Sequence, residues 1–180
     1  HSFPTRRSSD LNKKIGVIHL SRFGDDTIDL FNDAVRQMQA EKVSGVVVDL
    51  RNDPGGYLET AVDVASHWLP RGGLVVSEVS RDTSRNKKYE SAGYAELAKI
   101  KTVVLINGGS ASAAEILSGA LKDSGFATLI GEKSFGKGSV QQLIDLKEGG
   151  AVKVTIAKWV TPSGVNLNKN GLNPDIEVKI

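Results

Sequence analysis

The chain has 180 residues, of which 39% are hydrophobic and 24% are charged, a composition typical of a folded globular domain. Its 23 basic and 21 acidic side chains give a net charge of +2, and no basic run is interleaved with aromatic residues, so we expect no nucleic-acid partner. The absence of cysteine excludes disulfide frameworks, thiolate zinc sites and cysteine nucleophiles.

The first eleven residues, HSFPTRRSSDL, need separate treatment. An ordinary choice of codons for them spells a stretch that looks like a sequencing-library adapter read in frame. We therefore interpret residues 1–11 as non-native and residues 12–180 as the native part of the chain. An export signal would then lie upstream, so the sequence carries no information about one. The sequence contains no run of roughly 18 apolar residues, the length of a membrane span.

The first half of the native part predicts strands that alternate with helices. The segment GVVVDL at 45–50 is apolar without alternation, which is typical of a strand covered on both faces in a parallel sheet with helical crossovers. Asp25, Asp26 and Thr27 are suited to cap the first helix. The expected elements are a strand at 15–20, a helix at 25–40, a strand at 46–50, a helix at 57–69 and a strand at 74–79.

The second half begins with a polar stretch at 80–98 that has neither a helical nor a strand period, and we expect a long surface loop there. Two further strands and a helix follow, and then two strand patterns flank the turn KEGG, which predicts an antiparallel hairpin. These elements are expected at 102–106, 113–122 and 127–131, with the hairpin strands at 139–146 and 151–160. The fold class is therefore α/β, with a mostly parallel sheet, flanking helices and a C-terminal β-hairpin region.

Three glycine-rich turns each follow a predicted strand, at 49–56, 107–115 and 131–141. In an open α/β sheet, ligands bind at the carboxyl ends of the strands. We therefore expect the three turns to share one cleft.

The second turn places Ser112 at the start of a helix, where free N–H groups and the helix dipole favour developing negative charge. A serine there suits acyl transfer, with the N–H of Ala113 donating to the oxyanion. Ser110 lies outside the helix and is the weaker candidate. A structural alternative is equally specific, because Ser112 and Glu115 have the S-x-x-E spacing of a helix capping box. Taken alone, this segment favours the cap.

A serine nucleophile needs a base, and the two histidines of the native part fit poorly. His19 lies in a predicted strand and His67 near the end of an amphipathic helix, which favours packing or surface roles. Lys137 is the better candidate, because flanking glycines allow close approach to another loop. A lysine acts as a base only when neutral, which requires burial, and Phe135 and Val140 are the expected cover. The alternative is a solvated surface lysine.

Two other features of the turns complete the candidate site. Gln141 offers a neutral amide that can hold the lysine amine without stabilising its charged form. The N–H of Gly56 in the PGG turn is a second oxyanion donor, although paired glycines also serve backbone conformations with positive φ. A nucleotide-binding loop is excluded, because Gly138 stands where the phosphate motif needs serine or threonine.

Taken together, the blocks DLRNDPGG, NGGSASAAEILSGAL, LIGEKSFGKGSVQ and WVTPSGVNLNKNGLNPDIEV resemble the ordered signature of carboxyl-terminal processing peptidases, relatives of tail-specific proteases. The similarity runs from about residue 15 to the end of the chain. It implies a crotonase-like or Clp-like core and a serine/lysine dyad. Matched block to block, Ser112 is the nucleophile, Lys137 the base and Gln141 the amide that orients it, and the oxyanion donors are the backbone N–H groups of Gly56 and Ala113.

The resemblance also implies properties of the whole protein. Family members carry a PDZ domain before this core, so residues 12–180 are expected to be a partial peptidase core without it. The implied partners are protein or peptide substrates with unstructured C-terminal tails, and no cofactor or metal is expected. The protein is expected to be exported or membrane-anchored, in the periplasm or cell envelope of a bacterium rather than in the thylakoid lumen, where plant relatives act.

A second function stays open beside proteolysis. Relatives of this fold bind peptides or hydrophobic ligands without cutting them, so the chain is alternatively an inactive binding module. The feature that separates the two is the intact set of Ser112, Lys137 and Gln141, which a binder does not need.

Overall fold

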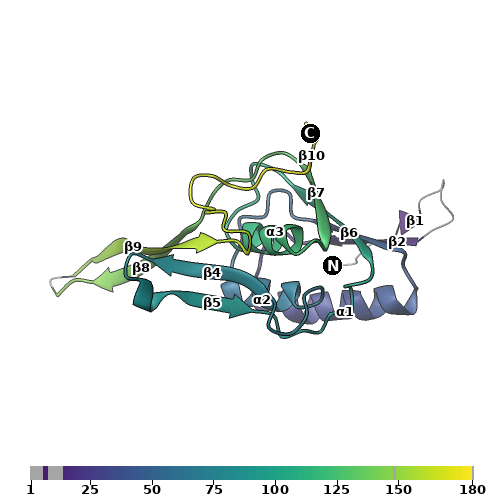
Figure 1. The fold of residues 1–180 in the computed structure, drawn as a ribbon, viewed down its shortest axis with the longest axis horizontal. Coiled ribbons are helices and arrows are strands. Elements are labelled where there is room, and N and C mark those ends of the chain that lie inside the picture. The colour runs from purple at the N-terminus through teal and green to yellow at the C-terminus, as the bar shows by residue number, and fades with distance from the viewer. Residues whose placement is uncertain (1–5, 8–13, 148, 180) are drawn as a thin grey trace.

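The computed structural model describes residues 6–7, 14–147 and 149–179, and this part of the chain forms two β-sheets packed with helices (Figure 1). The helices are α1 (Thr27–Ala40), α2 (Leu58–Ala65) and α3 (Ala113–Asp123), with a short 3₁₀ turn η1 (Thr83–Arg85). The strands are β1 (Arg6–Arg7), β2 (Lys14–His19), β3 (Gly45–Asp49), β4 (Leu74–Ser80), β5 (Lys87–Glu90), β6 (Lys101–Ile106), β7 (Ala127–Gly131), β8 (Ser139–Asp145), β9 (Ala151–Val160) and β10 (Ile176–Glu177).

The first sheet has the strand order β1-β2-β3-β6-β7-β10 and is parallel from β2 to β10, with β1 antiparallel to β2. Its central register aligns Ile18 with Val48 and Val48 with Val104, and all three side chains are fully buried. A sheet buried on both faces needs such continuous apolar strands. The predicted mostly parallel α/β architecture is therefore confirmed.

The second sheet has the order β5-β4-β9-β8 and is antiparallel throughout. It contains the predicted hairpin as β8 and β9, whose connecting turn includes residue 148, outside the described residues. Figure 1 shows this hairpin extending away from the body of the molecule. Strand β4 belongs to this second sheet, because it pairs with β5 and β9.

The core lies where α1, α2 and α3 meet the two sheets. Trp68 is fully buried, stacks in a tilted contact on Phe31, and donates its indole N–H to Thr102 Oγ1 at 2.9 Å. Trp159 from β9 joins the same cluster, which links the second sheet to the first. Among the described residues, no helix has both the length and the apolar character of a membrane span.

Three expectations from the sequence were wrong. Residues 80–98 are not a continuous loop, because Lys87–Glu90 pair with β4 as strand β5. The second helix ends at Ala65 rather than at residue 69. At the start of α1, the Asp26 side chain makes no capping bond, and instead Thr27 Oγ1 accepts the Gly24 N–H at 2.9 Å.

The expectation that residues 1–11 are non-native remains a prediction. Within that segment the structure describes only the short strand β1, and residues 1–5 and 8–11 lie outside the described residues.

Candidate active site

The candidate site lies at the carboxyl ends of four neighbouring parallel strands, β2, β3, β6 and β7. The three glycine-rich turns follow β3, β6 and β7, and they contact one another. Asn52 and Asn107 exchange two hydrogen bonds between the first and second turns, at 2.9 and 3.0 Å. The Phe135 N–H of the third turn donates to Ser110 O of the second at 3.0 Å. The three turns therefore meet at one edge of the sheet, whereas the cleft expected between them stays a prediction.

Ser112 stands at the corner between β6 and α3 in a strained backbone conformation. Its φ of 55° and ψ of −116° lie outside the regions that residues with a side chain normally occupy. A sharp, strained strand-to-helix turn of this kind exposes the nucleophile in α/β hydrolases. The predicted capping box with Glu115 is also present, since Glu115 Oε2 accepts the Ser112 N–H at 2.9 Å. Ser112 thus stands at the cap position in a strained conformation, and its side chain is half-buried.

The PGG turn packs directly against the Ser112 corner. Gly55 has a φ of +94°, and a Cβ at this position would lie 2.6 Å from Ala111 O and 2.8 Å from Ser112 Cβ. Only glycine fits there. Within the described residues, the N–H groups of Gly56 and Ala113 donate to no protein atom, so two free donors flank the serine corner.

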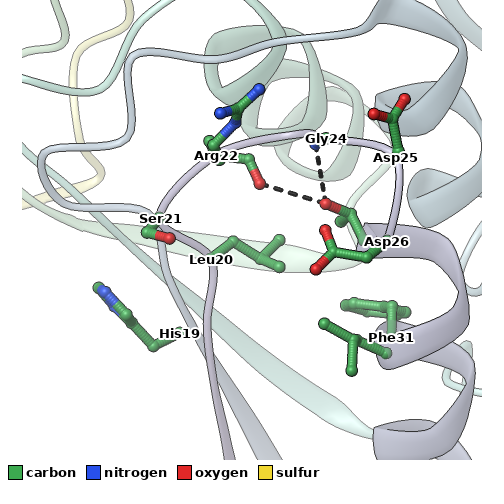
Figure 2. Close-up of a pocket in the computed structure, with 10 residues that line it drawn as sticks. His19, Leu20, Ser21, Arg22, Gly24, Asp25, Asp26 and Phe31 are labelled. Atoms are coloured by element: carbon green, nitrogen blue, oxygen red, sulfur yellow. Dashed lines mark hydrogen bonds between the residues drawn. The ribbon is translucent and has the colours of Figure 1, made fainter. Parts of the chain in front are cut away.

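A hollow of about 410 Å³ lies beside the PGG turn, at the carboxyl end of β2 (Figure 2). Its position follows from the backbone, because the Phe23 N–H donates to Gly55 O at 3.0 Å and Phe23 forms a parallel bridge with Gly56. Figure 2 shows Asp26 and Phe31 on the α1 side of this hollow, with His19 and Ser21 across from them. Exposed polar side chains, Arg22 among them, complete the rim.

The carboxylate of Glu115 joins the serine corner to the lysine loop. It is fully buried, and its Oε2 accepts both the Ser112 N–H and the Lys137 N–H at 2.9 Å. The two backbone nitrogens therefore lie within about 6 Å of each other. The other oxygen, Oε1, accepts the Gly136 N–H at 2.7 Å and the Ser134 hydroxyl at 2.6 Å. One buried side chain thus fixes the relative position of the two candidate catalytic residues.

The lysine loop is also held from its other side by the C-terminal segment. The Gly136 carbonyl accepts the Lys169 N–H at 2.8 Å, and the Gly138 carbonyl accepts the Trp159 N–H at 2.7 Å. A Cβ on Gly138 would lie 2.2 Å from Asn168 N, so the two backbones touch. The backbone around Lys137 is therefore fixed in position.

The side chains of Lys137 and Gln141 are exposed, in contrast to this fixed backbone. The expected apolar cover of Lys137 was wrong in part, because Phe135 is 66% exposed and does not shield the amine, whereas Val140 is half-buried against the core. The structure thus brings together the backbone of Ser112, Gly56, Ala113 and Lys137, and it leaves the lysine amine in solvent.

The histidines take the structural roles expected of them. His19 is exposed at the end of β2, with its Nδ1 3.6 Å from Asp49 Oδ2. His67 is buried against the Phe31 ring, with its Nδ1 3.0 Å from Glu96 Oε2, and burial lowers the pKa of the His67 imidazole. In the described part of the chain, acidic side chains and histidines form no group of three that could hold a metal ion.

Sequence reasoning did not single out Asp53, which lies in the PGG turn. Its side chain is fully buried; Oδ1 accepts the Gly55 N–H at 2.8 Å, and Oδ2 has no partner among the described residues. Burial raises the pKa of the Asp53 carboxyl to about 7, although the Gly55 hydrogen bond acts in the opposite direction. Its carbonyl also accepts the Ala111 N–H at 2.9 Å, so Asp53 links the oxyanion turn to the serine corner.

Comparison with known proteins agrees with this geometry. Residues 14–178 match peptidase family S41. The chain is 39% identical over 163 residues to the carboxyl-terminal-processing protease of Synechocystis sp., covering 91% of this chain and 38% of that protein. It is 33% identical over 165 residues to the carboxy-terminal processing protease CtpB of Bacillus subtilis, covering 92% and 34%. Among solved structures, the photosystem II D1 C-terminal processing protease superposes with a TM-score of 0.87 at 35% identity, covering 97% of this chain and 45% of that one. The chain spans less than half the length of each of these proteins.

Proposed function

The chain belongs to peptidase family S41, and from this premise we propose that it is the catalytic core of a serine endopeptidase that cleaves proteins near their C-terminus. The proposal includes a Ser112/Lys137 dyad and an acyl-enzyme intermediate. The observation that carries it is the strained Ser112 corner, flanked by two free N–H donors and tied through Glu115 to the Lys137 loop.

In the proposed reaction, Ser112 Oγ attacks the substrate carbonyl while the Lys137 amine takes the hydroxyl proton. The oxyanion receives hydrogen bonds from the Gly56 and Ala113 N–H groups, which donate to no other atom of the described residues. Lys137 then returns the proton to the leaving amine, and a serine ester remains. Water, deprotonated by the same amine, hydrolyses this ester and releases the product. Gln141 orients the lysine amine through its side-chain amide.

The proposed substrates are proteins or peptides with unstructured C-terminal tails, because only an extended chain can place its carbonyl at a corner between two turns. The hollow supports this, since it is lined by the loop that follows β2, and Phe23 of that loop forms a backbone bridge with Gly56. We also propose that the protein acts outside the cytoplasm, in the bacterial periplasm or cell envelope.

The direct test compares Ser112→Ala and Lys137→Ala in the full-length protein, using a folded reporter with a disordered tail and mass spectrometry of the products. Each change is expected to reduce kcat/KM by at least about 10³-fold without altering the circular dichroism spectrum. Lys133→Ala is the matched control, an exposed lysine of the same loop. Wild-type activity of Lys137→Ala would refute the dyad. Activity of Ser112→Ala would refute the serine mechanism altogether and favour another nucleophile.

A further inference from the structure

Strand β8 is an open edge of the second sheet. It pairs with β9 from Ser139 to Asp145, and among the described residues no strand lies on its other side. The side chains at 141–147 are all exposed. Figure 1 shows β8 and β9 together projecting beyond the helices.

The backbone groups on this edge alternate in direction. At the hairpin end, the Leu146 N–H donates to Gly150 O at 3.0 Å. In an antiparallel ladder, hydrogen-bonded residue pairs alternate with non-hydrogen-bonded pairs. Because Leu146 is in a hydrogen-bonded pair, Ile144 and Gln142 are hydrogen-bonded to β9 as well, and the residues between them are not. The N–H and C=O groups of Gln141, Leu143 and Asp145 are then directed away from β9, toward the open edge. They form a row of donors and acceptors that a further strand would satisfy.

Native proteins usually protect such an edge with lysine, proline or a covering element. Strand β5, the opposite edge of the same sheet, follows this rule, since its sequence KKYE carries three charges in four residues. Strand β8, with the sequence SVQQLID, has no lysine, arginine or proline, and its one charge is at the end. Its Leu143 is 65% exposed and its Ile144 45% exposed. One edge of the sheet is protected and the other is left open for pairing.

We propose that the open edge of β8 binds an extended segment of the substrate polypeptide as an additional β-strand beside the scissile bond. This inference rests on the proposed peptidase function. The occupant is an unfolded chain that supplies its own backbone N–H and C=O groups and presents apolar side chains at alternate positions. An unstructured C-terminal tail has this chemistry, whereas a folded surface does not.

Continuity with the candidate site argues for substrate rather than for a second copy of the chain. Strand β8 begins at Ser139, two residues after Lys137, and Gln141 belongs to the edge itself. A chain paired along β8 is therefore led toward Ser112, whose turn is fastened to the Lys137 loop by Glu115. A second copy paired here would occupy the same backbone groups, and self-association is the competing outcome of the test.

The first test uses the Ser112→Ala form of the full-length protein and a fluorescein-labelled peptide of alternating valine and serine, about eight residues long to match a strand. Fluorescence anisotropy gives its Kd, and a series of peptides carries one backbone N-methyl group at successive positions. Because only every second N–H of an added strand faces β8, affinity is expected to fall about five- to tenfold at alternate positions and to change little between them. Equal losses at all positions, or none, would overturn the proposal.

The second test compares Leu143→Pro, which removes an outward N–H, with Leu143→Thr, which removes the same side chain and keeps the N–H. For a disordered-tail substrate, Leu143→Pro is expected to lower kcat/KM about tenfold more than Leu143→Thr, mainly through KM. A short nitrophenyl ester, which reaches only the oxyanion site, reports the dyad separately. If the wild type hydrolyses neither substrate, the proposed function fails. If the ester is hydrolysed and the two variants cleave the tail equally, the β8 proposal alone fails. A Leu143→Pro change that only dissociates a dimer would assign the edge to self-association. If Leu143→Pro does not fold, the N-methyl series on the unaltered edge still decides.

Discussion

Replacing Glu115 by glutamine tests whether one buried carboxylate positions Ser112 and Lys137, the two proposed catalytic residues. The native side chain receives four hydrogen bonds, two on each oxygen. An amide keeps one oxygen and replaces the other with NH₂, a donor. If NH₂ replaces Oε2, the N–H groups of Ser112 and Lys137 both face a donor. If it replaces Oε1, the Ser134 hydroxyl can rotate to accept, but the Gly136 N–H cannot. The second orientation is the less costly, and it leaves one buried N–H without an acceptor.

The magnitude follows from these contacts. A buried N–H without an acceptor costs about 1–3 kcal/mol. The hydrogen bonds that remain at position 115 are also weaker, because their acceptor is no longer charged. We therefore expect Glu115→Gln to lower the free energy of unfolding by about 2–4 kcal/mol, a large share of the 5–15 kcal/mol typical of a domain. A shift of the Lys137 loop by about 1 Å is expected to lower kcat about 100-fold.

Both quantities are measured on the full-length protein. Stability is measured by urea denaturation. The kcat for the disordered-tail substrate is measured at a temperature at which the near-ultraviolet circular dichroism spectrum shows that the variant is folded. The second measurement separates positioning from stability, because a merely structural role leaves kcat of the folded fraction intact. Glu177→Gln, an exposed glutamate of β10, is the control and is expected to change both little. A Glu115→Gln protein with stability within about 0.5 kcal/mol and kcat within twofold of the wild type would refute the reasoning.

Three further predictions concern stability, each read by urea denaturation. Gly55→Ala would place a Cβ 2.6 Å from a carbonyl oxygen and is expected to lower the free energy of unfolding by about 2–4 kcal/mol. The control Gly125→Ala, at a glycine with a similar positive φ and open space around it, is expected to lower it by about 1 kcal/mol. Equal losses would contradict the predicted clash. Because burial raises the pKa of the Asp53 carboxyl from 3.8 to about 7, the folded state binds the extra proton, and stability is expected to fall by up to about 4 kcal/mol as pH rises from about 4 to about 7. Asp53→Asn should remove this slope and be the more stable form at alkaline pH, and an unchanged slope would contradict the assignment. Trp68→Phe removes the donor to Thr102 and is expected to cost about 1–3 kcal/mol, a prediction contradicted if the substitution is neutral.

The parallel sheet and its glycine turns could be predicted because their signals are local. Strands such as β3 contain uninterrupted apolar runs, and glycine or proline follows within a few residues in a turn. Strand β5 lacks any such signal. Its residues KKYE are polar and few, and they become a strand only because β4 supplies a partner, with Lys88 opposite Ser77. Tertiary pairing of this kind overrides local propensity.

The site shows the same division between local and distant causes. The S-x-x-E spacing predicted the capping box of Ser112 and Glu115, since the partners lie within one helical turn. It did not indicate that the same carboxylate also holds Ser134, Gly136 and Lys137, because those bonds depend on how β7 leads its loop back over α3. The expected cover of Lys137 failed for a related reason: Phe135 is near in sequence but points into solvent.

The exposed Lys137 side chain lies close to the start of the open β8 edge, so a chain bound at that edge would pass beside it. A lysine amine accepts a proton only when it is neutral, and water favours the charged form, so a dyad needs a dry environment at the moment of attack. The described chain fixes the backbone of Lys137 but leaves its side chain exposed. If a substrate strand lies along β8 toward Ser112, it passes the start of β8 two residues from this lysine and excludes water from it. Under the proposed dyad, the substrate strand would then provide the cover for Lys137 that Phe135 does not.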